Sequence, residues 1–201
     1  MMFIEKTFQV FELEGLDTRM AGIRTEIQPI FREVMAYVEQ AIQPIIHREL
    51  YTHIAQHRRR TVYAPESTWA ALSTQKRGYK MEAHLQLGIW PDYVCMWLSI
   101  IDQPKAKVEM AQLLVAHPEW LAALPVDFVY SPDHTQPAYF PIETVQPAID
   151  RLVNVKKSEL QIGRVITKES QLWQNPEEAR QWIVDTYQQL VPLYQQLNRF
   201  V

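Results

Sequence analysis

Hydrophobic and polar side chains alternate along residues 84–101 in the pattern of a β-hairpin with two unlike faces. Successive side chains of a strand point to opposite faces of a sheet. One face is aliphatic and carries Leu85, Leu87, Ile89, Val94, Met96, Leu98 and Ile100. The other is polar and aromatic and carries His84, Gln86, Gly88, Trp90, Tyr93, Cys95, Trp97 and Ser99. A turn at Pro91-Asp92 keeps like faces together, so we predict a core on the aliphatic face and the floor of a candidate site on the other.

Neighbouring segments extend this hairpin into a sheet. Residues 68–74 read as a strand, and residues 75–80 read as the loop that joins it to the hairpin. Residues 68–101 therefore predict three consecutive antiparallel strands, a meander. The pattern also predicts strands at 126–130 and at 160–167. The second of these places Leu160, Ile162, Arg164 and Ile166 on one face.

Apolar residues recur at helical spacing in the first quarter of the chain. We predict Asp17 as an N-cap, and the apolar positions beyond it are Ile23, Ile27, Ile30, Phe31, Val34 and Val38. Pro29 lies inside this pattern and predicts a kink or two abutting helices. Pro44 predicts the start of a further helix that reaches Ile54, and the basic run Arg58-Arg59-Arg60 suits its C-terminal end.

The second half of the chain adds three predicted helices, at 105–117, at 144–153 and beyond residue 175. The run Asn175-Pro176-Glu177-Glu178 is typical of a helix start, with a cap, a proline at the first helical position and acids in the first turn. Pro192 is predicted to bend or end this last helix. Residues 4–14 fit either a short strand or a helical turn.

Helices, then a meander, then mixed elements are typical of an α+β domain with one antiparallel sheet. The 201 residues are 47% hydrophobic and 21% charged, which is ordinary for a globular protein with a sizeable core. We therefore predict a single α+β domain over residues 1–201, with a central meander at about 68–101 packed by several helices.

The net charge and the cysteine content limit the cellular compartments and the classes of partner that we expect for this protein. The formal net charge of −3 argues against a general polyanion binder but leaves room for a local basic patch. Cys95 is the single cysteine, so no intramolecular disulfide can form, which fits a reducing compartment. The N-terminus lacks the pattern of a signal peptide, and no apolar stretch approaches the ~20 residues that span a bilayer. We predict a cytoplasmic protein without a membrane partner, and its oligomeric state stays open.

Short motifs are spread over nearly the whole chain: Gly15-Leu16-Asp17, Arg59-Arg60-Thr61-Val62, Lys76-Arg77-Gly78-Tyr79-Lys80, Gly88-Ile89-Trp90, Asp127-Phe128-Val129 and Val155-Lys156-Lys157. In this order and spacing they resemble the YktB-like proteins, an uncharacterised family of Gram-positive bacteria. The resemblance implies a single α+β domain. It brings with it no established activity, substrate, cofactor or catalytic residue.

Positive charges gather in two segments at the ends of the first meander strand. Arg58, Arg59 and Arg60 precede this strand, and Lys76, Arg77 and Lys80 follow it. Arginine and lysine side chains match the oxygens of phosphate or carboxylate groups. Gly78 between the second set can adopt the positive φ angle that aims backbone N–H groups at an anion. We interpret the two segments as a candidate anion site; the alternative is a set of solvated surface charges.

The polar face of the hairpin lies next to these basic segments. Side chains on this face could stack on a flat ligand and form hydrogen bonds to its edge; the candidates are His84, Gln86, Trp90, Tyr93 and Trp97, with Trp69 of the neighbouring strand as a further one. The alternative is that a helix covers this face, with His84 and Gln86 satisfied by backbone groups.

Motifs for metal, cofactor or covalent chemistry are weak. His53 and His57 are four residues apart on a predicted helix, but the spacing identifies no third ligand, so we predict no metal site. The sequence has neither a Walker-type run nor Gly-x-Gly-x-x-Gly, and we predict no cofactor. Cys95 is predicted to be a buried packing residue. Asp133 and His134 are adjacent, which does not by itself define an acid–base pair, so whether the protein is an enzyme stays open.

The function hypothesis is the binding of a small anionic ligand, for example a phosphorylated one. The predicted ligand-binding residues are Arg59, Arg60, Lys76, Arg77 and Lys80 for the anion and His84, Gln86 and Trp97 for the ligand body. Three alternatives stay open. A nucleic-acid-binding module is disfavoured by the acidic net charge and the short basic patch. An enzyme needs a histidine such as His84 or His134 beside an acid in one cleft. A protein-interaction module needs an exposed aromatic face.

Overall fold

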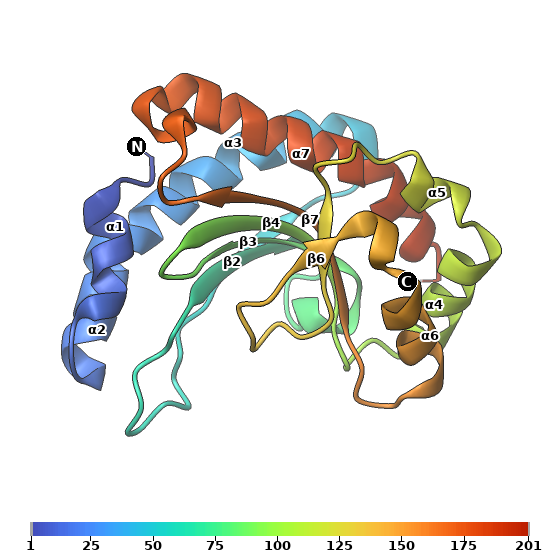
Figure 1. Cartoon of the computed structure of the whole chain (residues 1–201), viewed down its shortest axis with the longest axis horizontal. Helices are drawn as coiled ribbons and strands as arrows, with labels where there is room; N and C mark the ends of the chain where they lie inside the picture. The colour runs from blue at the N-terminus through green and yellow to red at the C-terminus, as the bar shows by residue number, and fades with distance from the viewer. Residues whose placement is uncertain (1, 201) are drawn as a thin grey trace.

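The computed structural model describes residues 2–200 and contains one antiparallel sheet of seven strands with helices packed around it (Figure 1). The strands are β1 (Tyr51–Ile54), β2 (Thr68–Ser73), β3 (His84–Ile89), β4 (Tyr93–Ile100), β5 (Val129–Ser131), β6 (Phe140–Pro141) and β7 (Leu160–Thr167). Their order in the sheet is β1-β2-β3-β4-β7-β5-β6. The predicted α+β class with a central meander is confirmed, because β2, β3 and β4 are consecutive neighbours.

The hairpin of β3 and β4 has the predicted register. Leu87 lies opposite Met96 and Ile89 lies opposite Val94, so aliphatic side chains meet across the pair. The Trp90 backbone N–H donates to the Tyr93 carbonyl at 2.9 Å, which closes the turn at Pro91-Asp92. All residues of β3 and β4 are buried, so the two strands need cover on both faces of the sheet.

Strand β7 has the predicted bounds and places an arginine on its aliphatic face. The guanidinium of Arg164 lies 4.4 Å from the ring centre of Phe128 and 5.2 Å from that of Trp182, and it pairs with Asp127 at 2.8 Å. The aromatic faces replace part of the hydration that burial removes. Gly163 on the same strand is required by close approach, because a Cβ there would lie 1.7 Å from the Met96 carbonyl oxygen.

The helices of the chain are α1 (Glu5–Gln9), α2 (Leu16–Gly22), α3 (Gln28–Ile46), α4 (Lys107–Ala116), α5 (Glu119–Ala122), α6 (Gln146–Asn154) and α7 (Pro176–Leu197). Residues 4–14 adopt the helical alternative, as α1 and a following turn over Val10–Glu12. The N-cap of α2 is Gly15 and not Asp17, which lies in the first turn. Pro29 does mark a boundary, since a π-helical segment (Ile23–Ile27) separates α2 from α3 immediately before it.

The prediction of a helix from Pro44 to Ile54 is wrong. Pro44 lies inside the last turn of α3, and that helix ends at His47, whose φ angle of 55° places it in the left-handed region. The chain then forms the edge strand β1, in which Tyr51 pairs with Ser73. Pairing with β2 overrides the helical spacing of the apolar residues, because an edge strand satisfies backbone groups that β2 otherwise leaves open.

Helices α3 and α7 lie across one face of the sheet (Figure 1). They pack on its aliphatic side chains, including Leu85, Leu87, Met96 and Leu98, to form the main core. The predicted start of α7 is confirmed: the Asn175 side chain accepts a hydrogen bond from the Glu178 backbone N–H. Pro192 does not end α7, which continues to Leu197.

The C-terminal end of α7 is attached to the meander by the Asn198 side chain, which bonds to both backbone groups of Ala83 as a neighbouring strand would. Asn198 accepts a hydrogen bond from the Ala83 backbone N–H at 3.1 Å and donates to the Ala83 carbonyl at 2.8 Å. Further up the helix, the Tyr187 hydroxyl donates to the Gln86 carbonyl at 2.7 Å. These buried bonds fix α7 against β3. Within residues 2–200, no helix has the length and apolar character needed to cross a membrane.

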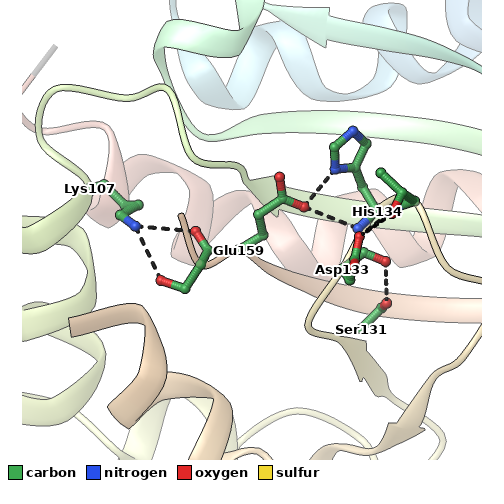
Figure 2. Close-up of polar contacts among 7 residues, drawn as sticks. Lys107, Ser131, Asp133, His134 and Glu159 are labelled. Atoms are coloured by element: carbon green, nitrogen blue, oxygen red, sulfur yellow. Dashed lines mark hydrogen bonds and ion pairs between the residues drawn. The ribbon is translucent and has the colours of Figure 1, made fainter. Parts of the chain in front are cut away.

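A buried lysine joins α4 to the turn that follows α6 (Figure 2). Lys107 is 6% exposed, and its Nζ lies 2.9 Å from the Val155 carbonyl, 2.7 Å from the Lys156 carbonyl and 3.2 Å from the Ser158 carbonyl. Carbonyl oxygens left open at a helix C-terminus attract a positive charge. Lys107 therefore determines the course of the turn that leads into β7.

We predict that Lys107→Met lowers the free energy of unfolding by about 2–4 kcal/mol, because three backbone carbonyls and the Ser158 hydroxyl lose a charged donor. Urea unfolding followed by circular dichroism measures the change. Lys105→Met is the matched control, since Lys105 is exposed and precedes the same helix. An equal effect of the two substitutions would contradict this role for Lys107.

Candidate functional site

A cleft of about 620 Å³ lies on the sheet face opposite α3 and α7. Its lining comes from residues 54–60, from Glu66, Ser67 and Trp69, from Tyr79-Lys80, from Gln103 and from His134-Thr135. Trp69 pairs with Gly88, so its side chain belongs to the polar face of the sheet. The cleft thus gathers segments that are up to 80 residues apart onto the face that the hairpin pattern singled out.

A second hollow, of about 470 Å³, lies between α4, α5 and α6. Its lining is mainly aliphatic, with Leu114, Leu121, Val145 and Ile149 among its residues. Among the described residues that line it, Glu143 alone is titratable, and we therefore place the candidate functional site in the basic cleft.

Two aromatic side chains form the centre of the cleft. The Trp69 indole N–H donates to the Tyr79 hydroxyl at 2.9 Å. Around the indole, the ring of His57 has its centre at 5.4 Å, the Lys80 ammonium lies at 5.7 Å and the ring of His134 lies at 6.5 Å. A cation and two imidazoles therefore surround one half-buried tryptophan.

The loop that carries Tyr79 and Lys80 is held by a buried carboxylate. Glu82 is fully buried and accepts hydrogen bonds from the Thr74 backbone N–H at 2.7 Å and from the Thr74 hydroxyl at 2.8 Å. Gly78 has a φ angle of 76°, as its place in the loop predicts. The hydrogen bonds between Thr74 and Glu82 thus join the two ends of the loop, and they set the position of Lys80 beside Trp69.

The structure brings together only part of the predicted anion site. Arg59, Arg60 and Lys80 line the cleft, whereas Lys76 and Arg77 are exposed in the same loop and do not line it. Arg58 lines the cleft as well, and within residues 2–200 none of these four cations forms an ion pair. Arg58–Arg60 belong to the loop after β1 and not to a helix end, which corrects the sequence-based expectation.

The histidine pair predicted on a helix is also placed differently. His53 lies on β1, with its Nε2 2.8 Å from the Gln75 carbonyl. His57 lies in the loop beyond it, with a φ angle of 49° and its Nε2 2.9 Å from the Thr68 hydroxyl. Burial and the nearby Arg60 lower the pKa of His57 to about 4. His57 therefore lines the cleft as a neutral ring at physiological pH.

The polar face of the hairpin is covered by loops and not by a helix. His84 is 1% exposed, Trp97 is 2% exposed and Gln86 is 9% exposed. The Tyr93 hydroxyl donates to the Pro137 carbonyl at 2.7 Å, and the Tyr93 and Tyr139 rings are 5.2 Å apart, so the loop before β6 packs on this face. His84 touches Tyr79, with ring centres 4.9 Å apart, but it does not line the cleft.

A hollow of about 10 Å³ remains under these loops. Gln86, Trp97, Gln161 and His134 are among its lining residues, so His134 borders both the hollow and the cleft. The Gln161 amide nitrogen is buried without a hydrogen-bond partner among the described residues. Such a donor is expected to have an acceptor, and a volume of this size holds one small polar group or one water.

A histidine and a glutamate form the most polar contact beside the cleft (Figure 2). His134 Nδ1 donates to Glu159 Oε2 at 2.6 Å, and the His134 backbone N–H donates to the same oxygen at 3.1 Å. A carboxylate accepts only, so Nδ1 carries the proton and Nε2 of the neutral ring has a free lone pair. The Glu159 side chain is 10% exposed and that of His134 is 23% exposed.

Asp133 adds a third potential metal ligand, since its carboxylate lies within 4.8 Å of the His134 and Glu159 ligand atoms. One oxygen of each of the two carboxylates already has donors. Asp133 Oδ1 accepts from the Thr135 N–H at 2.8 Å and from its hydroxyl at 2.6 Å, and Glu159 accepts from His134. The arrangement therefore suits an oriented imidazole better than a metal ion.

Cys95 has the properties of a packing residue, as predicted. It is 1% exposed and packs with Trp90, Tyr93 and Trp97. Burial raises the pKa of its thiol to about 12, so the reactive thiolate is not formed near neutral pH.

The pairing of His134 with Glu159 was not predicted from the sequence. The two residues are 25 positions apart, one in a loop and one before β7, and no spacing rule relates them. His57 and Tyr79 were also outside the predicted ligand contacts, whereas Trp69 was a candidate for stacking. Their signal in the sequence was their position next to the two basic segments.

The sheet, its loop-covered polar face and the cleft define an α+β protein with a basic, aromatic-lined cleft. The chain belongs to the family described as "Domain of unknown function (DUF1054)", which matches residues 3–194. It is 55% identical over 197 residues to a UPF0637 protein of Enterococcus faecalis, with 97% of each chain covered. It is 50% identical over 198 residues to the UPF0637 protein YsbB of Lactococcus lactis, with 98% of each covered. A UPF0637 protein of Oceanobacillus iheyensis is 38% identical over 194 residues, which covers 96% of this chain and 95% of that one.

These relatives confirm the resemblance to an uncharacterised bacterial family. The family has no assigned function, and the names of its members state neither a ligand nor a reaction. What the protein does must therefore be argued from the cleft itself.

We predict that acid destabilises the protein partly through His84. Burial lowers the pKa of His84 from 6.5 to about 4, so between these values the unfolded chain binds a proton that the folded chain excludes. The resulting stability is complete above pH 6.5 and is lost as the pH falls towards 4. Between pH 7 and pH 5 the expected loss is about 1–2 kcal/mol.

Urea unfolding at the two pH values measures this loss. His84→Asn keeps a donor near the position of Nδ1 but does not titrate, so its stability should change less between pH 7 and pH 5. His117→Gln is the control, because His117 follows α4 and its side chain is 40% exposed. An unchanged pH dependence in His84→Asn would contradict the assignment.

Proposed function

We propose that the protein binds a small anionic ligand, most simply a phosphorylated one, in the basic cleft. The observation that carries the proposal is the convergence of Arg59, Arg60 and Lys80 on one concave surface without acidic partners among residues 2–200. Unpaired cations at a concave surface repel one another and focus a positive potential. A bound anion removes this repulsion and accepts several charge-assisted hydrogen bonds.

The aromatic centre of the cleft supports a ligand with a body as well as a charge. Trp69 and Tyr79 are both half-buried, and their mutual hydrogen bond fixes the orientation of the indole. A flat or sugar-like group can pack against such a surface while its phosphate contacts the cations. In this proposal Gln86, Trp97 and His84 support the floor from below and do not contact the ligand directly.

One acidic residue, Glu66, also lines the cleft. A long polyanion would have to pass close to the Glu66 carboxylate and would be repelled by it. A compact anion bound by the arginines is repelled less. This is the reason for preferring a small ligand to single-stranded nucleic acid. A cytoplasmic location is part of the proposal, and the single buried thiol of Cys95 supports it.

Isothermal titration with inorganic phosphate and with ribose 5-phosphate tests the proposal. We predict that Arg60→Gln combined with Lys80→Gln weakens binding by about tenfold or more, since each charged hydrogen bond contributes about 1.5–3 kcal/mol. Lys76→Gln combined with Arg77→Gln removes the same charge outside the cleft and should change the dissociation constant by about twofold or less.

Two results would contradict the proposal. One is the absence of binding by the parent protein. The other is an equal loss in the two double variants, which would mean that overall charge and not the cleft attracts the anion. A parallel titration with a short oligothymidylate identifies nucleic-acid binding by affinity that falls steeply with salt.

A further inference from the structure

We propose that His134 is a nucleophile that accepts a phosphoryl group at Nε2 from a small phosphoryl donor, such as an acyl phosphate, bound in the cleft. The inference rests on the proposed function, because the cleft cations must hold the donor. It adds a reaction to binding and assigns that reaction to one atom.

The orientation of the His134 ring is the first argument. Nδ1 and the backbone N–H of His134 both donate to Glu159 Oε2, at 2.6 Å and 3.1 Å, so the ring has its proton on the Glu159 side (Figure 2). Nε2 lies at the other end of the ring, and no hydrogen bond to it is found within residues 2–200. A free, oriented lone pair of this kind is what a nucleophilic imidazole requires.

The surroundings of Glu159 show that this contact is built into the fold. Glu159 follows directly after Ser158, whose carbonyl and hydroxyl both contact the buried Lys107 ammonium. The Glu159 side chain is only 10% exposed, and within residues 2–200 both of its hydrogen bonds come from His134. A buried carboxylate committed to one imidazole stabilises the positive charge that forms on the ring when Nε2 attacks.

An unsatisfied donor among the residues that line the hollow beside His134 is an independent observation that points to a ligand. Gln161 is 1% exposed, and its amide nitrogen has no hydrogen-bond partner among the described residues. It lines the small hollow that His134 also borders. A phosphoryl oxygen near Nε2 provides the acceptor that this donor lacks. On the cleft side, Lys80 lies beside the same Trp69 ring as His134.

The step balances without a further reactant. The Nε2 lone pair forms the N–P bond, and the P–O bond to the leaving group breaks. With acetyl phosphate as donor, acetate leaves with the electron pair. The Nδ1 proton stays in its hydrogen bond to Glu159, so the phosphorylated ring is a cation paired with a carboxylate. Water later attacks phosphorus, or an acceptor alcohol does, and Nε2 regains its lone pair.

The same chain contains a matched control pair. His117 Nδ1 lies 2.9 Å from Glu119 Oε1, but both side chains are exposed, at 40% and 64%, and the His117 ring stacks on Trp120. This pair is a histidine and a glutamate outside the cleft. A reaction that depends only on such a pair should modify both histidines, whereas a reaction of the cleft should modify His134 alone.

The test uses the full chain incubated with acetyl phosphate. Intact mass at alkaline pH should show one added phosphoryl group that is lost in acid, and peptide mapping should place it on His134. His134→Gln should abolish the modification. Glu159→Gln, which keeps the shape but not the charge, should slow it at least tenfold. Glu119→Gln should leave it unchanged. Mapping in the parent protein needs no variant, so the test holds even if His134→Gln fails to fold.

The outcomes separate this inference from the proposed function. Phosphate binding without modification of His134, or modification of another histidine, overturns the inference and leaves the proposed function standing. Turnover of acetyl phosphate without a phosphorylated protein also overturns it, because His134 would then act on water. Modification of His134 that is unchanged in Arg60→Gln/Lys80→Gln supports the nucleophile and contradicts the proposed role of the cleft cations.

Discussion

The burial of strands β3 and β4 on both faces is the constraint on which the rest of the structure depends. A sheet whose central strands are covered on both sides needs two separate layers of cover. Helices α3 and α7 supply the layer over the aliphatic face. The other face carries His84 and Gln86, which need polar partners that an apolar helix surface does not offer. The connecting loops supply this second layer, and the cleft lies where they meet.

Polar cover of this kind explains why the candidate chemistry lies where it does. Loops bring backbone groups and short polar side chains to the sheet, and each buried group must be satisfied. Glu82 closes one loop through Thr74, and Lys107 closes another through the carbonyls before Glu159. Both are charged groups buried with hydrogen bonds to neutral partners. Together they set the positions of Lys80 on one side of the cleft and of Glu159 and His134 on the other.

The elements predicted with success are those whose signal is local. The bounds of β7, the register of β3 and β4 and the start of α7 follow from alternation, from a two-residue turn and from a capping asparagine before proline. The segment from Pro44 to Ile54 failed because its apolar spacing fits a helix, while the decisive partner, β2, lies about 20 residues further on. The misplacement of His57 and of Arg58–Arg60 has the same origin.

The candidate site, too, was predictable in part from local sequence and in part only from the tertiary structure. The sequence by itself determined that one face of the hairpin is polar, that basic segments adjoin it and that Cys95 has no disulfide partner within the chain. Only the tertiary structure decided that loops cover this face, that Lys76 and Arg77 lie outside the cleft and that His134 meets Glu159. Alternation and charge are properties of neighbouring residues, whereas the meeting of residues 25 positions apart depends on strand order and on loop closure, which no local pattern encodes.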